Sequence, residues 1–388
     1  MKIKSIIIFL TVILTFSKSN SQDVDTLINI GTHNMHFNIW EGNGTPILFE
    51  SGGGNDGNIW ANLANQVHSI TGTTVITYDR VGYGKSEFNP NLPDDKKALI
   101  INGIDALEKG LEKLNLLEEL ILVGHSYGGY YSTYFASKHP AKIKGVVLID
   151  AVTSCFHTDE FITKQEAERN EEWLLNIKEQ SLPLYFECLS NIETIELMRN
   201  YSIPIEIPVF SLVAENPPYE DSKENERWKS CHQDFVNAHP NRKGMVASNC
   251  GHYLHFDNSK LAVDAIIGLW VKSSQDATMI NILEKYLTYS NEYTNNYRKQ
   301  EFEYRHSERD LNRWGYSLLA ENKLSAAIKL FELNTILYPE SFNVWDSYAE
   351  VLLANGEKDK AIVMYKKSLD LNPENTNAKE AIKEIEEK

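Results

Sequence analysis

Ser126 stands at the centre of Gly124-His125-Ser126-Tyr127-Gly128, directly after the apolar run ELILVGH. A serine hydroxyl needs a neighbouring base to act as a nucleophile, and a tight turn between a strand and a helix presents its oxygen to a substrate. Glycines two residues on either side remove the Cβ atoms that would clash in such a turn. Ser126 is therefore the candidate nucleophile of an acyl-transfer reaction.

The candidate general base lies towards the C-terminus. Nucleophile turns of this kind are followed along the chain by an acid and then by a histidine. In the segment SNCGHYLHFDNSKLAVDAI, Gly251 and His252 stand in the loop between the last apolar run and the final helical pattern. His252 is therefore the predicted base. His255 is the alternative, and we expect it to pack against the final helix instead.

The elements that must position these residues form a repeating pattern from about Asp25 to Lys272. Short apolar runs alternate there with helical patterns, and the runs read TPILFE, TTVITYD, ELILVGH, IKGVVLID, IPVFSLVA and KGMVASN. Continuous Val, Ile and Leu runs separated by amphipathic helices indicate a mostly parallel sheet covered on both faces. We therefore predict a doubly wound α/β domain over residues 22–272. Residues 153–203 carry no strand pattern and predict a small helical lid.

The segment from Asp25 to Lys272 resembles a serine hydrolase of the α/β-hydrolase superfamily. The resemblance covers about two thirds of the chain and rests on the G-x-S-x-G turn, the Gly-His loop, YDRVGYGKS and ESGGG. Exported bacterial members read ESGGG where many relatives have His-Gly. In the family this glycine loop lies against the nucleophile and supplies one oxyanion donor. By this resemblance the two donors are the backbone N–H groups of Gly53 and Tyr127.

The resemblance leaves two candidates for the triad acid. Most relatives place an Asp shortly after the strand that reads IPVFSLVAENPPYED here, but this chain has Pro217 and Pro218 at that point, and Glu215 is the nearest carboxylate. Some branches supply the acid from the end of the preceding strand, where this chain has Asp150. We favour Asp150 and keep Glu215 as the alternative. Either carboxylate would fix the tautomer of the catalytic imidazole.

The activity implied by the resemblance is hydrolysis of a carboxylic ester or lactone through an acyl-enzyme, with no metal or organic cofactor. A serine at the turn argues against the haloalkane dehalogenase and epoxide hydrolase branches, which use Asp there. The loop also lacks the His-Gly-Gly-Pro-Gly of proline-releasing peptidases. Macrolide lactones, the substrates of the macrolide esterases of this superfamily, fall within the expected class. The alternative is a non-catalytic protein whose C-terminal region recruits a peptide or protein.

The C-terminal region carries an internal repeat. Aligning Pro339 with Pro373 superposes Trp314 on Tyr348 and other residues at the same offset of 34 positions. These offsets resemble the tetratricopeptide repeat, in which small residues let two helices cross closely. We predict a helical linker over 273–306, and two repeats with a capping helix over 307–388. The repeats would bind a partner chain or mediate self-association.

The N-terminus and the composition indicate export. Residues 1–21 show two lysines, a short apolar run and small residues, which is the order of a signal peptide, and we expect periplasmic or secreted protein with no membrane span after cleavage. The formal net charge is −16. Such a surface repels phosphate backbones, so nucleic acid is excluded as a partner.

The sequence leaves the state of the cysteines undecided and assigns no function to two early histidines. The cysteines are Cys155, Cys188, Cys231 and Cys250, and the sequence distinguishes neither among their three possible pairings nor between one or two disulfides and free buried thiols. His33 and His36, in the segment HNMH, are expected to face solvent on an early strand.

Overall fold

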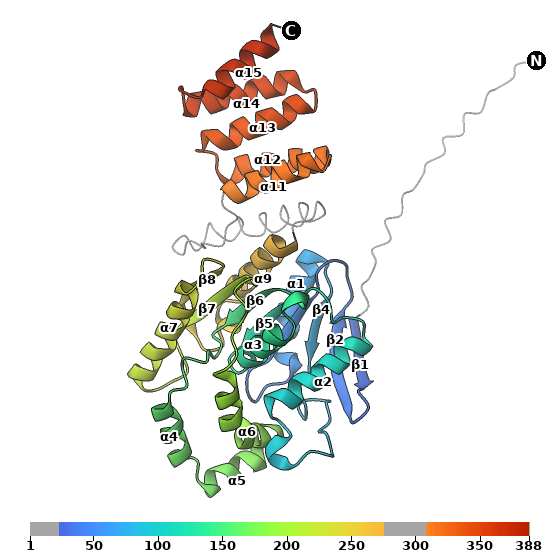
Figure 1. The fold of residues 1–388 in the computed structure, drawn as a ribbon, viewed down its shortest axis with the longest axis vertical. Coiled ribbons are helices and arrows are strands. Elements are labelled where there is room, and N and C mark those ends of the chain that lie inside the picture. The colour runs from blue at the N-terminus through green and yellow to red at the C-terminus, as the bar shows by residue number, and fades with distance from the viewer. Residues whose placement is uncertain (1–22, 275–307, 388) are drawn as a thin grey trace, which may run out of the picture.

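The computed structural model describes residues 23–274 and 308–387 (Figure 1). The predicted signal peptide, residues 1–21, lies outside the described residues, as does nearly all of the predicted linker, residues 273–306. Within the described ranges no helix combines the length and the apolar character that crossing a membrane requires.

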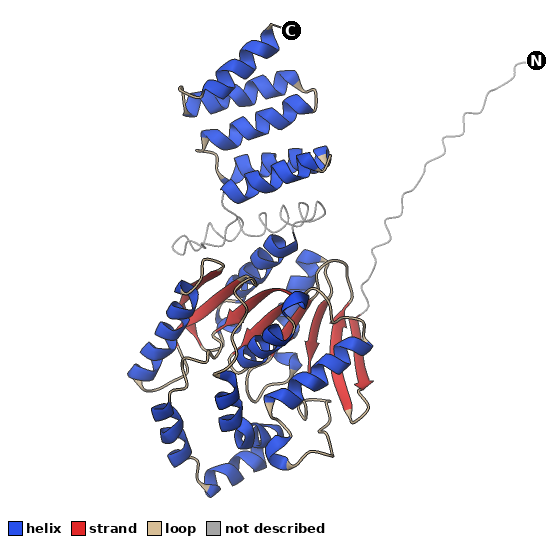
Figure 2. Ribbon diagram, viewed as in Figure 1, coloured by secondary structure: helices blue, strands red, loops and turns tan. Residues whose placement is uncertain are grey.

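A mixed sheet of 8 strands forms the centre of residues 23–274 (Figure 2). Its spatial order is β1-β2-β4-β3-β5-β6-β7-β8. β2 pairs antiparallel with β1 on one side and with β4 on the other, and the strands β3 to β8 run parallel to one another. The strands are β1 (Asp23–Asn29), β2 (Asn34–Trp40), β3 (Ile47–Glu50), β4 (Val75–Tyr78), β5 (Leu120–His125), β6 (Ile143–Ile149), β7 (Val209–Asn216) and β8 (Arg242–Gly251).

Helices cover both faces of the sheet, as the continuous apolar strands require. One face packs against α1 (Ala61–Thr71) and α9 (Ser259–Ser274). The other packs against α2 (Ile100–Lys113), α3 (Gly128–Lys138) and α7 (Ser222–Asn237). Alternate residues of β5 point to opposite faces, so that its odd-numbered apolar side chains join the first core and its even-numbered ones the second. The predicted doubly wound architecture is thus observed, with an antiparallel edge added at β1 and β2.

The predicted lid is a group of three helices inserted between β6 and β7: α4 (Asp159–Glu168), α5 (Glu171–Gln180) and α6 (Leu182–Met198) (Figure 1). Each begins where the sequence supplies an N-cap side chain. Thr158 and Ser181 accept hydrogen bonds from the backbone N–H groups three residues on, and Asn170 does the same for α5. Such caps satisfy donors that the first turn leaves unpaired.

The C-terminal described residues form α11 (Glu308–Ala320), α12 (Leu324–Leu337), α13 (Phe342–Ala354), α14 (Lys358–Leu371) and α15 (Thr376–Glu386). The helices α11, α12 and α13 begin 34 residues before α13, α14 and α15, respectively. This spacing is the period predicted from the sequence. At Gly315 a Cβ atom would lie 2.6 Å from the ring of Phe331, so the glycine lets α11 and α12 approach closely.

The expectation that His33 and His36 face solvent is wrong. Both side chains are buried, and His36 lies between two carboxylates, with its Nδ1 2.8 Å from Asp79 and its Nε2 2.8 Å from Asp25. The alternation of polar and apolar residues in β2 does not report burial here, because a polar residue can be buried once it is hydrogen-bonded.

Candidate active site

Ser126 lies in a strained turn between β5 and α3. Its φ is 51°, in the left-handed region that residues other than glycine rarely adopt. The Ser126 carbonyl accepts hydrogen bonds from the backbone N–H groups of Gly129 and Val152, both at 2.9 Å, which hold the turn. A Cβ at Gly128 would lie 2.5 Å from the Glu50 carbonyl oxygen. The glycine thus allows the nucleophile turn to press against the end of β3.

The imidazole of His252 connects Ser126 to Asp150. Its Nε2 is 2.9 Å from Ser126 Oγ, and its Nδ1 is 2.7 Å from Asp150 Oδ2. Because the carboxylate accepts the Nδ1–H, the Nε2 lone pair is left to accept the serine proton. The chain of hydrogen bonds is therefore arranged as a general base requires.

Asp150 is fully buried and is held by more than the histidine. Its other oxygen, Oδ1, accepts hydrogen bonds from the indole of Trp228 and from the backbone N–H of Ala214, each at 2.9 Å. Its φ of 42° turns the chain sharply at the end of β6. The side chain is thus fixed in one orientation towards His252.

Glu215, the alternative acid, is engaged elsewhere. Its carboxylate accepts a 2.6 Å hydrogen bond from the backbone N–H of Asn249, and its side chain is exposed at the end of β7. Among the two carboxylates proposed from the sequence, the structure brings Asp150 to the imidazole.

His255, the alternative base, is buried behind the site. Its ring lies 4.6 Å from that of Trp60 and 4.7 Å from that of His125, measured between centroids. Burial lowers the pKa of His255 to about 4, and the neighbouring His252 contributes a smaller part of that shift. It therefore serves as a neutral aromatic packing group within α8 (Leu254–Asp257) and not as the partner of Ser126.

His125 supports the loop that carries His252. Its Nε2–H donates a 2.9 Å hydrogen bond to the backbone carbonyl of His252. Burial holds the pKa of His125 well below its usual range, and the neighbouring His255 and His252 lower it further. A Cβ at Gly52 would lie 2.8 Å from the His125 ring, so the glycine loop and this histidine pack directly against each other.

The glycine loop lies over the residue that follows the nucleophile. A Cβ at Gly53 would lie 3.7 Å from the Tyr127 Cβ. Within residues 23–274, neither the backbone N–H of Gly53 nor that of Tyr127 donates a hydrogen bond to another residue. Two free backbone donors beside the candidate nucleophile would suit an oxyanion hole.

Sequence reasoning misses a buried charged group beside this loop. Arg80 donates hydrogen bonds through Nη2 to the Gly52 carbonyl at 2.7 Å and to Glu187 of α6 at 3.1 Å. Tyr83 donates to the same Glu187 oxygen at 2.9 Å. Arg80 and Tyr83 belong to YDRVGYGKS, which points to them, but the lid sequence carries no signal for Glu187.

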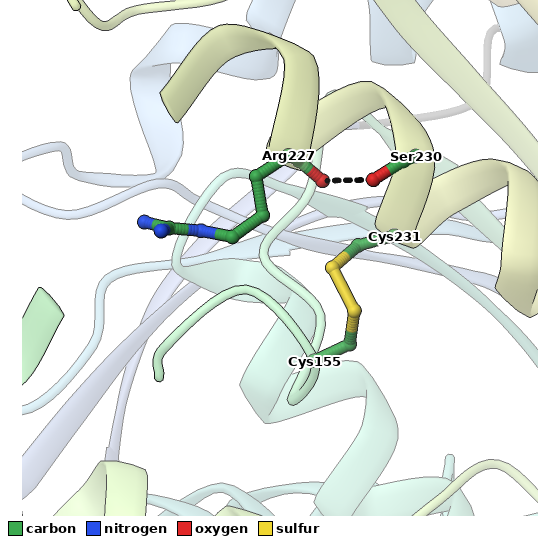
Figure 3. Close-up of a disulfide and its surroundings, with 4 residues drawn as sticks. All are labelled: Cys155, Arg227, Ser230 and Cys231. Atoms are coloured by element: carbon green, nitrogen blue, oxygen red, sulfur yellow. Dashed lines mark hydrogen bonds between the residues drawn. A yellow bond between two sulfur atoms is a disulfide. The ribbon is translucent and has the colours of Figure 1, made fainter. Parts of the chain in front are cut away.

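A disulfide ties the segment after β6 to α7. Cys155 and Cys231 are bonded, with Cα atoms 5.8 Å apart (Figure 3). Cys231 lies one turn along α7 from Trp228, the residue that binds Asp150, so the bond anchors the helix that positions the acid. Cys188 and Cys250 are free.

Across the described ranges, no cluster of three or more His, Cys, Asp and Glu side chains could hold a metal ion.

Comparisons with known proteins agree with this architecture. A family model described as alpha/beta hydrolase fold matches residues 45–173. The chain is 32% identical over 105 residues to the abhydrolase domain-containing protein abhd-5.2 of Caenorhabditis elegans, covering 27% of this chain and 23% of that protein. It is 29% identical over 106 residues to the (lyso)-N-acylphosphatidylethanolamine lipase of Bos taurus, covering 27% of this chain and 30% of that protein.

The chain thus spans less than a third of the length of these curated relatives. Among solved structures, the epoxide hydrolase VrEH1 of Vigna radiata superposes with a TM-score of 0.53 at 13% identity, covering 64% of this chain and 98% of that one. At this identity the likeness concerns the fold alone.

Proposed function

Starting from the α/β-hydrolase fold of residues 23–274, we propose that the protein is a serine hydrolase that cleaves carboxylic esters or lactones through an acyl-enzyme. The observation that carries the proposal is the continuous hydrogen-bonded chain from Ser126 Oγ through His252 to the buried Asp150. A serine, not a carboxylate, occupies the nucleophile turn, which favours acyl transfer over reactions that proceed through an alkyl-enzyme ester.

The reaction begins with attack of Ser126 Oγ on the acyl carbonyl carbon. The serine proton passes to His252 Nε2, and negative charge develops on the former carbonyl oxygen. The free N–H groups of Gly53 and Tyr127 stabilise that oxygen. Because each such donor acts in a site with little water, losing one typically costs about 10²–10³ in rate.

Collapse of the tetrahedral intermediate breaks the ester C–O bond. The leaving alkoxide takes the proton from His252, and the alcohol departs while the acyl group stays on Ser126. A water molecule then gives a proton to the same imidazole and attacks the acyl carbon. This second cycle releases the carboxylic acid and restores the serine hydroxyl. Asp150 keeps the imidazole oriented in both steps.

The lid carries a cavity whose lining residues all belong to the lid itself. A cavity of about 440 Å³ lies among α4, α5 and α6 and is lined by Gln165, Arg169, Trp173, Cys188 and Asn191. That volume falls in the range of pockets that take drug-sized ligands. The indole, amide and guanidinium groups of this lining would suit part of an amphipathic ester, and we keep macrocyclic lactones within the proposed substrate class.

The C-terminal helices supply a second, separable role in this proposal. Their 34-residue spacing supports tetratricopeptide repeats, which would recruit a partner chain or a second copy of the protein. We also propose that residues 1–21 direct export and are removed, which agrees with the presence of a disulfide in the hydrolase domain.

The test uses residues 22–388 and a panel of p-nitrophenyl esters and macrocyclic lactones, with products followed by mass spectrometry. Ser126→Ala should lose nearly all activity, since removing a triad nucleophile costs about 10⁶ in kcat in well-studied cases. Asp150→Ala should lose about 10⁴, whereas Glu215→Ala should stay near wild type. A wild type that cleaves no ester or lactone would favour the partner-binding alternative.

A further inference from the structure

A buried ion pair joins the lid to the core next to the candidate oxyanion hole. Arg80 follows β4, and Glu187 lies in the middle of α6. The side chain of Arg80 is 2% exposed and that of Glu187 is 9% exposed. Since charged residues are seldom buried without a purpose, this pair calls for an explanation beyond lid stability.

Arg80 and Tyr83, the two residues that donate to Glu187, hold the glycine loop on both sides of Gly53. The Gly52 carbonyl accepts a 2.7 Å hydrogen bond from Arg80, and the Gly54 N–H donates a 3.2 Å bond to the Tyr83 hydroxyl. Arg80 and Tyr83 in turn both donate to Oε2 of Glu187. The backbone on either side of the Gly53 N–H is therefore fixed by groups that share one lid carboxylate.

The other oxygen of Glu187 faces the loop directly. A Cβ at Gly53 would lie 2.6 Å from Glu187 Oε1, so a side chain at this position would force the Glu187 carboxylate to move. This contact places a carboxylate close to where the oxyanion would form. Left unpaired, its charge would oppose the charge that develops there.

Arg80 supplies the compensating charge. Its guanidinium lies against the rings of Tyr83, Tyr127 and Tyr131, with its central carbon 5.0–5.4 Å from the ring centroids. Its Nε and Nη1 have no hydrogen-bond partner in the part of the chain that the structure describes, so Nη2 makes both polar contacts. Burial raises the pKa of Glu187 and Arg80 counteracts that rise.

We propose that Glu187 is a positioning residue which, through Arg80 and Tyr83, holds the Gly53 N–H in place for the oxyanion. The inference rests on the proposed ester hydrolysis. On this proposal, the packing of α6 against the core also places the Gly53 N–H for the oxyanion. Arg80 has two tasks, to fix the Gly52 carbonyl and to neutralise the lid carboxylate.

The test measures kcat and KM for p-nitrophenyl acetate with the full mature chain. Glu187→Leu should lower kcat about 10–100-fold, part of the cost of losing an oxyanion donor, and change KM less than about 3-fold. Glu187→Gln should stay within about 5-fold of wild type, because the amide oxygen still accepts both hydrogen bonds. Rescue by the amide would show that the bonds, and not the packing alone, carry the effect.

A double variant separates the two tasks of Arg80. Arg80→Met leaves the Glu187 carboxylate without its cation, and we expect the largest loss of kcat here. Adding Glu187→Gln to Arg80→Met removes that charge and should restore kcat about 5-fold or more, since coupled residues are not additive. If the two substitutions lowered kcat by independent factors that multiply in the double variant, the inference would be overturned.

The matched control is a second ion pair between the lid and the core. Glu193, also on α6, binds Lys96 at the surface, where both side chains are partly exposed. Lys96→Met/Glu193→Gln should leave kcat within about 2-fold, because exposed pairs contribute little. A kcat loss in this control equal to that of Glu187→Leu would assign the effect to lid attachment in general and overturn the positioning role.

A transition-state analogue guards against loss of folding. A trifluoromethyl ketone adds to Ser126 as a tetrahedral adduct whose oxyanion meets the same donors, so its Ki should rise by the factor by which kcat falls in Glu187→Leu. An unchanged Ki would overturn the inference while leaving ester hydrolysis intact. Ester hydrolysis retained by Ser126→Ala would instead overturn the proposed function, and the inference with it.

Discussion

Ser126 and Asp150 are both held in the left-handed region of the backbone, with φ of 51° and 42°. Such conformations cost roughly 1–3 kcal/mol each and persist where the surrounding structure imposes them. Here each residue directly follows a buried strand, and its side chain hydrogen-bonds His252. The strain at these two positions accompanies the short hydrogen bonds that they make to the imidazole.

Ser126 can be predicted from the sequence more readily than Asp150. The glycines around Ser126 indicate its turn, because a Cβ at either position would collide with the backbone or with Ser132. Nothing comparable marks Asp150, and the choice between it and Glu215 depends on the Trp228 indole, which comes from 78 residues away along the chain. Contacts of that separation cannot be obtained from local patterns.

A prediction at the residue scale concerns His255. Its pKa is about 4 in the folded protein and near 6.5 in the unfolded chain. Between these values the unfolded chain binds more protons, so the stability that the neutral ring supports is lost as pH falls from 6.5 towards 4. His255→Phe keeps an aromatic ring beside Trp60. The free energy of unfolding of this variant should change between pH 7 and pH 5 by about 2 kcal/mol less than that of wild type.

The measurement is the free energy of urea unfolding at both pH values, followed by tryptophan fluorescence. Glu50 acts in the opposite direction, since burial raises its pKa to about 8 and its contribution falls as pH rises through that range. Comparing wild type with His255→Phe cancels the Glu50 effect. Equal pH dependence in the two proteins would contradict the assignment of His255 as a buried neutral ring.

Among the elements, the parallel strands β3 to β8 follow the predicted apolar runs, whereas β1 and β2 do not stand out in the sequence. Central strands covered on both faces read as continuous Val, Ile and Leu runs, but strands at a sheet edge need not. The lid helices are also foreseeable from their caps. Their contacts with the core are not, because Glu187 meets Arg80 across 107 residues.

A prediction at the element scale concerns the disulfide. Cys155 and Cys231 enclose a sequence separation of 76 residues, and removing a bond that closes so long a loop should cost about 2–5 kcal/mol. Cys155→Ser/Cys231→Ser should therefore lower the melting temperature, and activity near that temperature should fall because α7 carries Trp228. The check is thermal unfolding with and without a thiol reductant.

Cys188→Ser is the matched control for that experiment, since Cys188 is a free thiol. Its melting temperature should respond to reductant as wild type does, whereas the double variant should be insensitive. A wild-type melting temperature unaffected by reduction would contradict a stabilising role for the bond.

Over the whole molecule, the groups of the proposed reaction all lie between residues 50 and 252, and the C-terminal helices contribute none of them. The 34-residue period is visible in the sequence because identical crossings need the same small and aromatic residues at the same offsets. The sequence identifies no partner for those helices, since the surface residues that would contact one are not constrained by packing.

A prediction at this scale separates the two parts. Gly315→Val places a side chain against the Phe331 ring and should destabilise the α11–α12 pair by about 1–3 kcal/mol. Ester hydrolysis should stay within about 2-fold of wild type. Circular dichroism during heating and the p-nitrophenyl acetate rate provide the two readouts.

Ser317→Val tests the same substitution chemistry on the exposed side of α11 and should leave both readouts near wild type. A loss of ester hydrolysis in Gly315→Val, without one in Ser317→Val, would show that the helical region supports catalysis and contradict the separation.

The most direct test of the proposed nucleophile is covalent labelling of the mature chain with a fluorophosphonate, followed by peptide mass spectrometry. We predict one adduct, formed as Ser126 Oγ displaces fluoride from phosphorus. Labelling should be about 100-fold or more slower in His252→Gln, because the serine then lacks its general base. An adduct on another residue, or no adduct in a folded wild-type protein, would contradict the account.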